Sequence, residues 1–330
     1  MQRKIKWGIL GCAGIAKKQF LPALLDVDDA ELWAIGSRDR DRAQCWAAKW
    51  EANRAYGSYE AVLEDPEVEA VYIPLPNLFH AEWTIKALRA KKHVLCEKPM
   101  AVTLSQAEQM LEVAKEEQRL FMEGFMYRFH PQIDQALAWI GEGQIGEVSL
   151  VRGSFSFMMK DRENIRLQDV PGAGSLWDVG CYPIHFMNLV FGGPPQSVLA
   201  QGHFLENTSV DLSMAGLLDY GSGRQGMFDC SFEQMRRSSL EIVGKTGTIT
   251  IPVPWRPDRQ EVAITLHRGN MRQTITFPIH NPYQLEIEHF QSCLKGETEL
   301  LLPGTLGLDL IKTIRACSKS ARLGCAQILD

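Results

Sequence analysis

Residues 5–16 read IKWGILGCAGIA, and they decide how the rest of the chain is interpreted. An apolar run predicts a buried strand, and a glycine-containing turn joins it to an amphipathic stretch. That context is typical of a dinucleotide-binding loop, whose backbone approaches a pyrophosphate. Ala13 and Ala16 stand where such a loop usually has its second and third glycines, so the motif alone only slightly favours a cofactor site over an ordinary tight turn. The candidate residues are Gly11, Cys12, Ala13, Gly14, Ile15 and Ala16.

Short apolar runs alternate with amphipathic stretches as far as residue 124. The runs read as strands and the stretches as helices. Strands that are apolar on both faces are typical of a parallel sheet covered by helices on both sides. We therefore predict a Rossmann-like, doubly wound domain over residues 1–124. Its expected strands lie at 5–10, 32–35, 70–73, 93–96 and 120–123.

Longer alternating runs occupy residues 125–330, and turn formers such as Gly247 separate them. Alternation of apolar and polar residues is typical of antiparallel strands with one buried face. We predict a second domain with a largely antiparallel sheet and a closing helix over 305–323. The expected runs lie at 147–157, 196–204, 211–218, 226–232, 239–251 and 261–277.

The composition excludes several classes of protein. The 330-residue chain has a net charge of −5, with 45% hydrophobic and 23% charged residues. Nucleic-acid binding is not expected, because it needs clustered Lys and Arg, and no apolar stretch approaches the length of a membrane-spanning helix. No signal peptide is recognisable at the start. The eight cysteines contain no CxxC pair, so we expect reduced thiols, no metal site and a cytoplasmic protein.

The second predicted strand leads into GSRD at 36–39. Enzymes that use NAD usually place a carboxylate here to bind ribose hydroxyls, whereas Arg38 is able to pair with a 2′-phosphate and Ser37 to hydrogen-bond to it. The sequence therefore favours NADP, with NAD as the alternative. The same residues also suit a helix cap, and Arg40 and Arg42 fit a solvated helix face.

A second polar turn, Cys96-Glu97-Lys98-Pro99, ends a buried apolar run. If this run is a strand of the doubly wound sheet, the turn lies at its carboxyl edge, where such sheets bind ligands. Pro99 restricts the backbone of Lys98 and thereby directs the ammonium group. Taken alone, a surface lysine in a turn is an equally good interpretation.

Five motifs, in their order and spacing, resemble the Gfo/Idh/MocA family of oxidoreductases over nearly the whole chain. The chain is most similar to dimeric dihydrodiol dehydrogenases and NADP-dependent D-xylose 1-dehydrogenases. The resemblance implies a Rossmann domain and a C-terminal α/β domain with an open, mainly antiparallel sheet, which pairs subunits into a homodimer or homotetramer. The motifs are GCAGIA at 11–16, VYIPLPN at 71–77, HVLCEKP at 93–99, EGFMYRFHP at 123–131 and GSLWDVGCYPIH at 174–185.

The chain departs from the family pattern at three positions. Ala13 replaces the usual second glycine of the phosphate loop, and Lys91 stands where a glycine commonly precedes the strand. Ala173 replaces a glycine in the stretch before the last motif. The fold is expected to tolerate all three changes, which bear on cofactor affinity and on the shape of the substrate loop.

The last motif carries three polar side chains. If the segment is helical, its spacing places Asp178, Tyr182 and His185 on one face, although Pro183 makes His185 the least secure of the three. A packing tyrosine or a core histidine is the alternative for either residue alone. The resemblance implies that Lys98, Asp178 and Tyr182 are the catalytic residues.

Oxidation of an alcohol needs a base for the hydroxyl proton while hydride leaves the carbon. A tyrosine with a pKa of about 10 is a weak base near neutrality. The ammonium of Lys98 would favour the phenolate of Tyr182, and Asp178 would orient the lysine or the substrate. In the reverse direction Tyr182 would donate the proton while Lys98 stabilises the developing charge. We therefore expect an NAD(P)-dependent dehydrogenase that acts on CH–OH groups.

Further residues are assigned by the same resemblance. The loop after the strand at 70–73 is expected to reach the nicotinamide side of the cofactor, and Glu97 is expected beside it. Substrate contact is a weaker expectation for a second group, because packing or structural ion pairs explain those residues equally well. The cofactor group is Leu75, Pro76, Asn77, His80, Glu97 and Lys98, and the substrate group is Tyr127, Arg128, Arg162 and His185.

The expected partner is a small sugar-like or diol molecule. An aldose such as D-xylose or D-glucose, oxidised to its lactone, is the first choice. A trans-dihydrodiol, a keto-deoxysugar, an anhydrosugar or a cyclitol remains an alternative. A non-enzymatic, NADP-binding regulator of the same fold is a further alternative, although the retention of Lys98, Asp178 and Tyr182 argues against it.

Overall fold

The computed structural model describes residues 3–329, which form two compact units. The first unit extends through Met126 and also contains Tyr283–Gly304. The second unit comprises Tyr127–Pro282 and the described residues from Thr305 onward. The first division falls after Met126, and a later segment of the chain belongs to the first unit.

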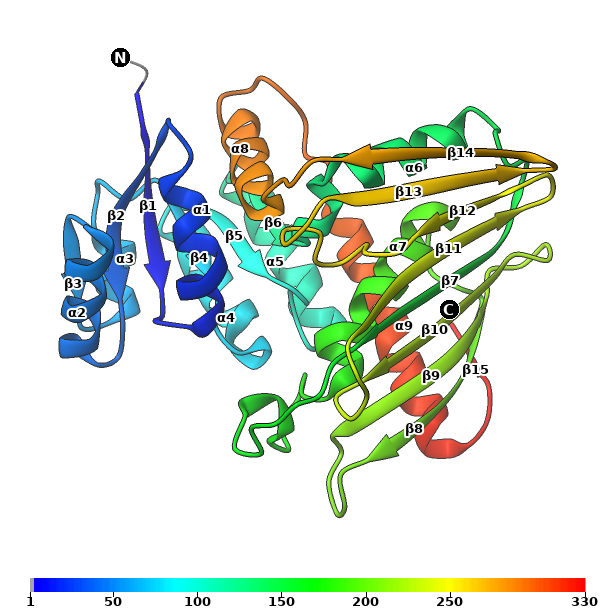
Figure 1. Ribbon diagram of the computed structural model, residues 1–330. Helices are drawn as coiled ribbons and strands as arrows, with labels where there is room; N and C mark the ends of the chain where they lie inside the picture. Colours follow the sequence, from blue (N-terminus) through cyan, green and yellow to red (C-terminus); the bar gives the residue numbers. More distant parts are fainter. Residues whose placement is uncertain (1–2, 330) are drawn as a thin grey trace. The chain divides into compact units, whose positions relative to one another are not determined.

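Six parallel strands form the sheet of the first unit, in the order β3-β2-β1-β4-β5-β6 (Figure 1). This is the strand order of a Rossmann fold, in which ligands bind outside the carboxyl ends of the strands where the order reverses. Here that position lies between β1 and β4. The strands are β1 (Ile5–Leu10), β2 (Ala30–Gly36), β3 (Arg54–Tyr56), β4 (Ala70–Ile73), β5 (His93–Glu97) and β6 (Phe121–Gly124).

Helices of the first unit bury their apolar sides against this sheet. α4 and α5 also contact each other, and α8 is the helix that returns from later in the chain. The helices are α1 (Leu21–Leu25), α2 (Arg40–Trp50), α3 (Tyr59–Glu64), α4 (His80–Arg89), α5 (Leu104–Glu116) and α8 (Pro282–Leu294).

Aromatic packing explains why α8 belongs to the first unit. Phe290 is fully buried against Trp7, with ring centroids 5.2 Å apart. Trp7 Nε1 also donates to Gln291 Oε1 at 3.1 Å. Phe20 contacts Trp7 at 5.7 Å and stacks on Tyr72 at 3.6 Å. One core therefore joins β1, β4 and α8.

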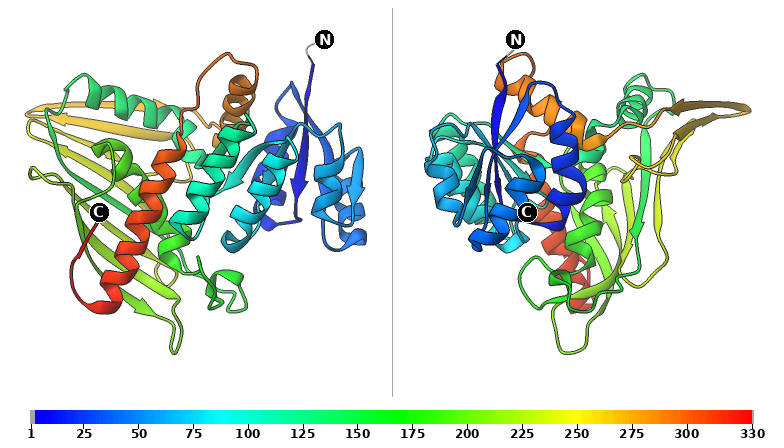
Figure 2. Two further views of the ribbon diagram at one scale, coloured as in Figure 1. Left: turned by 180° about the vertical axis from the view of Figure 1, so that it is seen from behind. Right: turned by 60° about the vertical axis from the view of Figure 1, so that its left-hand side comes forward.

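Nine strands form the sheet of the second unit, in the order β14-β13-β12-β11-β7-β10-β9-β8-β15. Every neighbouring pair is antiparallel except β7 with β10, which is parallel. α7 and α9 lie on one face of the sheet (Figure 2), and α6 packs on β13. The strands are β7 (Val148–Ser156), β8 (Ser197–Phe204), β9 (Asp211–Asp219), β10 (Gln225–Ser231), β11 (Arg237–Gly244), β12 (Thr248–Ile251), β13 (Val262–Arg268), β14 (Met271–Phe277) and β15 (Gln327–Ile328), and the helices are α6 (Pro131–Gly141), α7 (Cys181–Phe191) and α9 (Gly304–Leu323).

The other face of this sheet is open. Val198 and Ala200 of β8 are buried, whereas Leu199 between them is 45% exposed. Leu217 of β9 and Met227 of β10 are likewise exposed. The prediction of an α/β fold with a parallel Rossmann sheet and an open, mainly antiparallel second sheet is therefore confirmed. In the part of the chain that the structure describes, no helix combines the length and hydropathy needed to cross a membrane.

Two long predicted runs are hairpins in the structure. The run at 239–251 divides into β11 and β12, and Gly247 lies in the turn between them. The run at 261–277 divides into β13 and β14, with Gly269 at a φ of +56° in the turn. β3 was not predicted, because it has three residues and none of them is buried.

Candidate active site

The loop after β1 provides room for a phosphate group. Gly11 has a φ of +111°, and a Cβ there would lie only 2.9 Å from Leu75 Cδ2. An L-residue is therefore strained at this position. A Cβ at Gly14, in contrast, would have no heavy atom within 4 Å. The loop is tight at Gly11 and open at Gly14, the residue next to Ala13, which occupies the usual position of the second glycine.

A wide helical turn follows this loop. The segment Ala16–Phe20 is a π-helical turn that continues directly into α1, and Pro22 occupies the second position of α1. A proline lacks the N–H that a regular α-helix would use here, and a wider turn accommodates this loss. The two alanines of the loop differ in burial: Ala16 is buried, whereas Ala13 is half-buried.

Of the two caps that the sequence allowed after β2, Ser37 and Asp39, the structure uses Asp39. Asp39 caps α2, because its carboxylate accepts from the Arg42 backbone N–H at 3.1 Å. Ser37 is buried, and its Oγ accepts from the Asp39 N–H at 3.2 Å. The side chain of Arg38 is exposed. Arg38, the second residue after β2, is thus accessible to a ligand.

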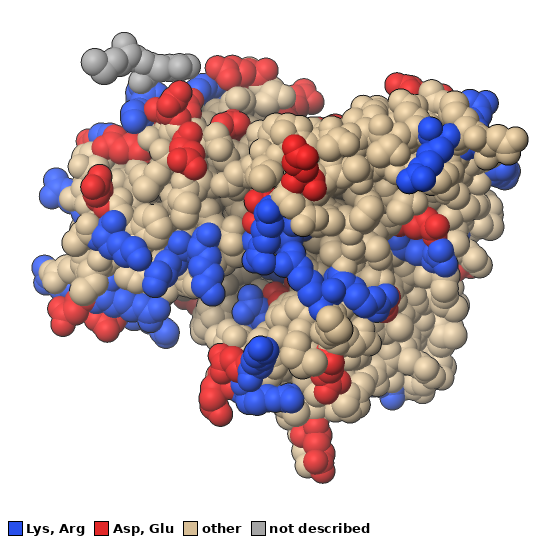
Figure 3. All heavy atoms as spheres, in the orientation of Figure 1, with Lys and Arg blue, Asp and Glu red and all other residues tan. Residues whose placement is uncertain are grey.

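Arg42 has a contact that the sequence did not indicate. Its Nη2 donates to the carbonyl oxygen of Cys12 at 2.7 Å, so a cation of α2 supports the phosphate loop. Burial raises the pKa of Tyr59, and the nearby charges of Arg38 and Arg42 oppose this effect. The three side chains therefore gather around the loop. Figure 3 shows Lys and Arg side chains on the part of the first unit where the strands of its sheet end.

The loop after β4 is held by a buried histidine. Asn77 begins a short 3-10 helix over Asn77–Phe79, and Leu75 and Pro76 are partly exposed before it. His80 is fully buried, with Nε2 2.6 Å from the Leu75 carbonyl oxygen and Nδ1 2.7 Å from that of Pro99. Burial lowers its pKa to about 4, although both backbone bonds oppose the shift. Any influence of His80 on a cofactor therefore passes through the two loops it joins.

The turn after β5 carries the lysine of the third motif. Lys98 is half-buried and precedes a cis peptide bond to Pro99. On one side of it, Tyr72 Oη donates to Glu97 Oε1 at 2.6 Å. On the other side, the Met100 N–H donates to Glu123 Oε1 at 2.7 Å. Together with the bond to His80, these contacts fix the backbone around Lys98.

The last motif is helical and lies in the second unit. A π-helical turn over Leu176–Gly180 leads directly into α7, and Pro183 is the third residue of α7. Asp178 lies in the π-helical turn and forms an ion pair with Arg166, whose Nε is 2.8 Å from Asp178 Oδ2. Arg166 is therefore a functional candidate as well. Arg162 lies on the same segment and is exposed.

Aromatic rings surround Tyr182, which is 6% exposed. Its ring centroid lies 5.2 Å from that of Phe155, 5.8 Å from that of Tyr127 and 5.8 Å from that of Trp255. Trp255 Nε1 donates to the Ser154 carbonyl oxygen at 2.8 Å. Apolar walls of this kind hold a side chain in one orientation and exclude water from it.

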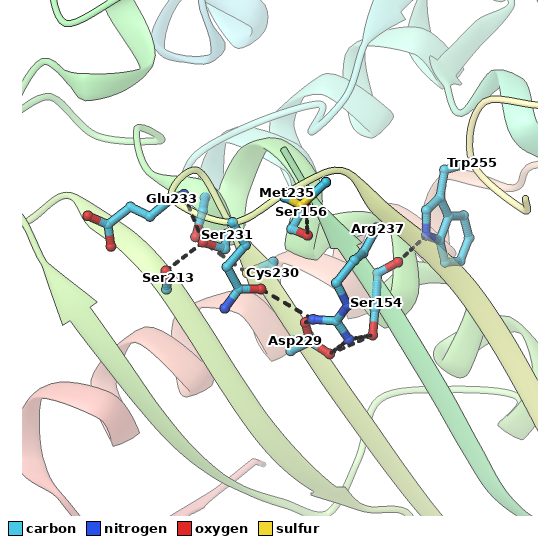
Figure 4. A network of polar contacts seen from close by, with 12 residues as sticks. Ser154, Ser156, Ser213, Asp229, Cys230, Ser231, Glu233, Met235, Arg237 and Trp255 are labelled. Carbon is cyan, nitrogen blue, oxygen red and sulfur yellow. Dashed lines mark hydrogen bonds and ion pairs between the residues drawn. The ribbon is translucent and has the colours of Figure 1, made fainter. Parts of the chain in front are cut away.

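A polar network ties this aromatic wall to the sheet (Figure 4). Ser154 Oγ donates to Asp229 Oδ1 at 2.5 Å, and Arg237 Nη1 donates to Asp229 Oδ2 at 2.8 Å. Ser156 Oγ donates to the Met235 carbonyl oxygen at 2.9 Å. The strand β7 that carries Phe155 is thereby fixed across three strands. The sequence did not indicate this support, because its members lie far apart along the chain.

His185 and Tyr127 are core residues. His185 is 1% exposed, and its Nδ1 lies 2.7 Å from Tyr127 Oη, a fully buried hydroxyl. Burial and the charge of Arg128 lower the pKa of His185 to about 3, so the ring is neutral. Arg128 itself is buried and pairs with Asp134. Tyr182 and His185 thus converge on Tyr127, whereas Asp178 is paired with Arg166.

Comparison with known proteins identifies the family of both units. Residues 5–125 match a family described as an oxidoreductase family with an NAD-binding Rossmann fold. Residues 133–250 match the GFO/IDH/MocA C-terminal domain. The first match covers the phosphate loop and the Lys98 turn, and the second covers Asp178 and Tyr182.

Relatives align over most of the chain. A D-xylose 1-dehydrogenase (NADP(+)) from Haloferax volcanii is 34% identical over 98% of this chain and 99% of its own length. A dTDP-3,4-didehydro-2,6-dideoxy-α-D-glucose 3-reductase from Actinomadura kijaniata is 35% identical over 89% of each chain. The structure of KijD10, a 3-ketoreductase from A. kijaniata in complex with NADP and TDP-benzene, superposes with a TM-score of 0.88 at 33% identity and covers 96% of this chain and 98% of that one. The chain therefore belongs to the Gfo/Idh/MocA family of NAD(P)-dependent oxidoreductases.

Proposed function

We propose that this protein moves a hydride between NADP and a carbon that bears a sugar-type hydroxyl or carbonyl group. Its expected reaction is the oxidation of an aldose such as D-xylose or D-glucose to the lactone. The observation that supports this best is Lys98, half-buried at the carboxyl end of β5 in a Rossmann sheet and held by backbone contacts on both sides.

The first unit would hold the cofactor. The open surroundings of Gly14 suit the pyrophosphate, and exposed Arg38 suits a 2′-phosphate. Arg42 adds a second positive charge at the same loop. Leu75, Pro76 and Asn77 would lie on the nicotinamide side. When bound, the cofactor supplies the hydride acceptor or donor.

The chain's own residues would move the proton. Tyr182 would take the proton from the substrate hydroxyl, and the Lys98 ammonium would favour the phenolate that this role needs. In reduction the same tyrosine would donate the proton, while Lys98 stabilises negative charge on the substrate oxygen. Asp178, held by Arg166, would orient the substrate or the lysine. The aromatic wall around Tyr182 would keep water away from the proton.

A substrate panel tests the proposal. Purified protein with NADP or NAD would be mixed with D-xylose, D-glucose, inositols or benzene dihydrodiol, and the absorbance of the reduced nicotinamide followed. We expect a sugar to reduce NADP, and we expect Lys98→Met and Tyr182→Phe to lose about 100-fold or more of kcat while retaining cofactor binding. Tyr220→Phe is the matched control, because Tyr220 is also buried in the second unit and donates to Asn188 Oδ1 at 2.7 Å.

Two results would redirect the proposal. If the dihydrodiol or a cyclitol is turned over in place of a sugar, the reaction type stands and the substrate class changes. If the wild type binds NADP tightly and turns over nothing in either direction, a cofactor-binding regulator replaces the enzyme.

The open face of the second sheet supports a homodimer. Leu199, Leu217 and Met227 project from it, and Arg152 pairs with Glu241 beside them. An exposed apolar face bordered by charges is typical of an interface between subunits. We expect a dimer or tetramer in sedimentation velocity, and a monomer for Leu217→Arg. A monomeric wild type would contradict this assignment.

A further inference from the structure

A buried carboxyl group lies beside the catalytic turn without a role in the mechanism above. Glu123 is the third residue of β6 and is 7% exposed. Its Oε1 accepts from the Met100 N–H at 2.7 Å, two residues beyond Lys98. β6 lies close to the turn here: a Cβ added at Gly124 would be only 3.2 Å from the Cys96 carbonyl oxygen. The carboxyl group is thus attached to the backbone that carries the lysine.

Three ionisable groups face Glu123 from β5 and the turn that follows it. Lys98 attracts its charge, Glu97 opposes it, and the thiol of Cys96 is buried next to it. Glu97 already accepts a hydrogen bond from Tyr72. Glu123 therefore supplies a second carboxyl group next to Lys98, and its backbone contact fixes where that group lies.

We propose that Glu123 is the positioning residue of Lys98, whose ammonium it holds in place by its negative charge and whose turn it anchors through the Met100 N–H. This inference rests on the proposed function, because it assigns Lys98 to catalysis. The Glu123 carboxyl group is 7% exposed, and Lys98 is the cation whose charge acts on it.

The proposal has a consequence for the pH dependence. Burial raises the pKa of Glu123 to about 7, although the Met100 N–H and Lys98 oppose the shift. Above that pH the carboxylate is charged and holds the ammonium. Below it the neutral acid still accepts the Met100 hydrogen bond through its carbonyl oxygen but attracts Lys98 much less. We therefore expect kcat to fall as the pH decreases through about 7.

The test is the pH profile of kcat and KM for Glu123→Gln. Glutamine keeps the shape and the acceptor for Met100 but removes the charge. A charge-assisted interaction of this kind corresponds to a loss of about tenfold to hundredfold in kcat. We also expect the ionisation near pH 7 to disappear, while KM for NADP changes by less than about threefold. An unchanged kcat and an unchanged profile would overturn the proposal.

A control variant separates charge from packing. Glu286 of α8 is 1% exposed, and burial and the charge of Glu97 raise its pKa well above the usual value. Glu286→Gln makes the same substitution at another buried glutamate of the first unit and is expected to keep the wild-type profile. If it changes the profile as Glu123→Gln does, the effect comes from packing and the proposal fails. Should Glu123→Gln not fold, the absence of an ionisation near pH 7 in the wild type would overturn the proposal by itself.

The double variant Lys98→Met/Glu123→Gln tests whether Glu123 acts through Lys98. We expect the double variant to match Lys98→Met alone, because positioning has no effect once the ammonium is gone. A further tenfold loss in the double variant would mean that Glu123 acts elsewhere and would overturn the proposal. A fully active Lys98→Met would instead refute the proposed function itself, so the two failures are distinguishable.

Discussion

Two arginines near the phosphate loop make different predictions for the two nicotinamide cofactors. Arg38 is exposed two residues after the end of β2, where it would meet only the 2′-phosphate that distinguishes NADP from NAD. Arg42 donates to the Cys12 carbonyl oxygen at 2.7 Å, and this loop serves both cofactors. Arg38→Ala should therefore weaken NADP selectively, whereas Arg42→Ala should weaken both.

The magnitudes follow from the contacts that each substitution removes. A charge-assisted hydrogen bond contributes about 1.5–3 kcal/mol, so Arg38→Ala should raise the Kd of NADP by about tenfold to hundredfold and leave the Kd of NAD unchanged. The bond from Arg42 to a neutral carbonyl lies near the lower end of that range. We expect about a tenfold rise in Kd for both cofactors, with a further rise for NADP from the lost charge.

Isothermal titration calorimetry with NADP and NAD, at one fixed ionic strength, measures both effects. Arg40→Ala is the matched control, because Arg40 also lies at the start of α2 but packs its methylene groups against Gly57. It should leave both affinities unchanged. The reasoning is refuted if Arg38→Ala weakens NADP and NAD equally, or if Arg42→Ala leaves NAD binding intact.

Two further predictions concern stability. Phe290→Ala should lower the free energy of unfolding, measured by urea titration, by about 3–5 kcal/mol, because it leaves a cavity beside Trp7. Leu25→Ala is the control: Leu25 is exposed, so this substitution should lower the free energy of unfolding by less than about 1 kcal/mol. Equal losses for the two variants would contradict the packing of α8. His185 has its pKa lowered to about 3, so the unfolded chain binds the proton first and stability falls as the pH decreases below about 6.5. At pH 5 this histidine should lower the free energy of unfolding by about 2 kcal/mol relative to pH 7.5. His185→Asn keeps an acceptor for Tyr127 and should remove this part of the pH dependence of the free energy of unfolding. An unchanged pH dependence would show that the ring is not buried in the neutral form.

The first sheet was predictable because its strands are buried on both faces. β4 is apolar throughout, and the predicted runs for β1 and β5 agree closely with the structure. Such strands differ from their surroundings in composition alone, so no knowledge of pairing is needed. The short strand β3 is partly exposed and gives no such signal.

The return of α8 to the first unit was not predictable in the same way. Its membership depends on Phe290 meeting Trp7 and on Gln291 meeting the indole N–H, contacts between residues nearly the whole chain apart. The parallel pairing of β7 with β10 is another long-range choice. Local pattern specifies a strand or helix, but pairing depends on which distant partner completes the core.

The candidate site was predictable where its residues follow strands. Arg38, Glu97 and Lys98 lie at carboxyl ends of parallel strands, and the sequence indicates those ends. Arg42 was missed because a solvated helix face explains it equally well; its position four residues after Arg38 was the available signal. Arg166 was not given a definite role, since only the fold brings it to Asp178.

Lys91 shows how a departure from the family pattern is accommodated. Glycine is usual at this position, and the structure gives Lys91 a φ of +61°, the left-handed region that glycine adopts without strain. The exposed side chain pairs with Glu117. The chain therefore holds a residue with a side chain in a left-handed conformation at some conformational cost.

The central claim is that hydride passes directly between the substrate carbon and the nicotinamide under the control of Lys98 and Tyr182. The most direct test uses a sugar deuterated at the reacting carbon, with mass spectrometry of the cofactor after reaction. The account predicts that the deuterium appears on the nicotinamide ring of NADP, and that Lys98→Met and Tyr182→Phe, with cofactor bound, slow the transfer by about 100-fold or more. Transfer at the wild-type rate in both variants, or no label on the nicotinamide while substrate is consumed, would contradict it.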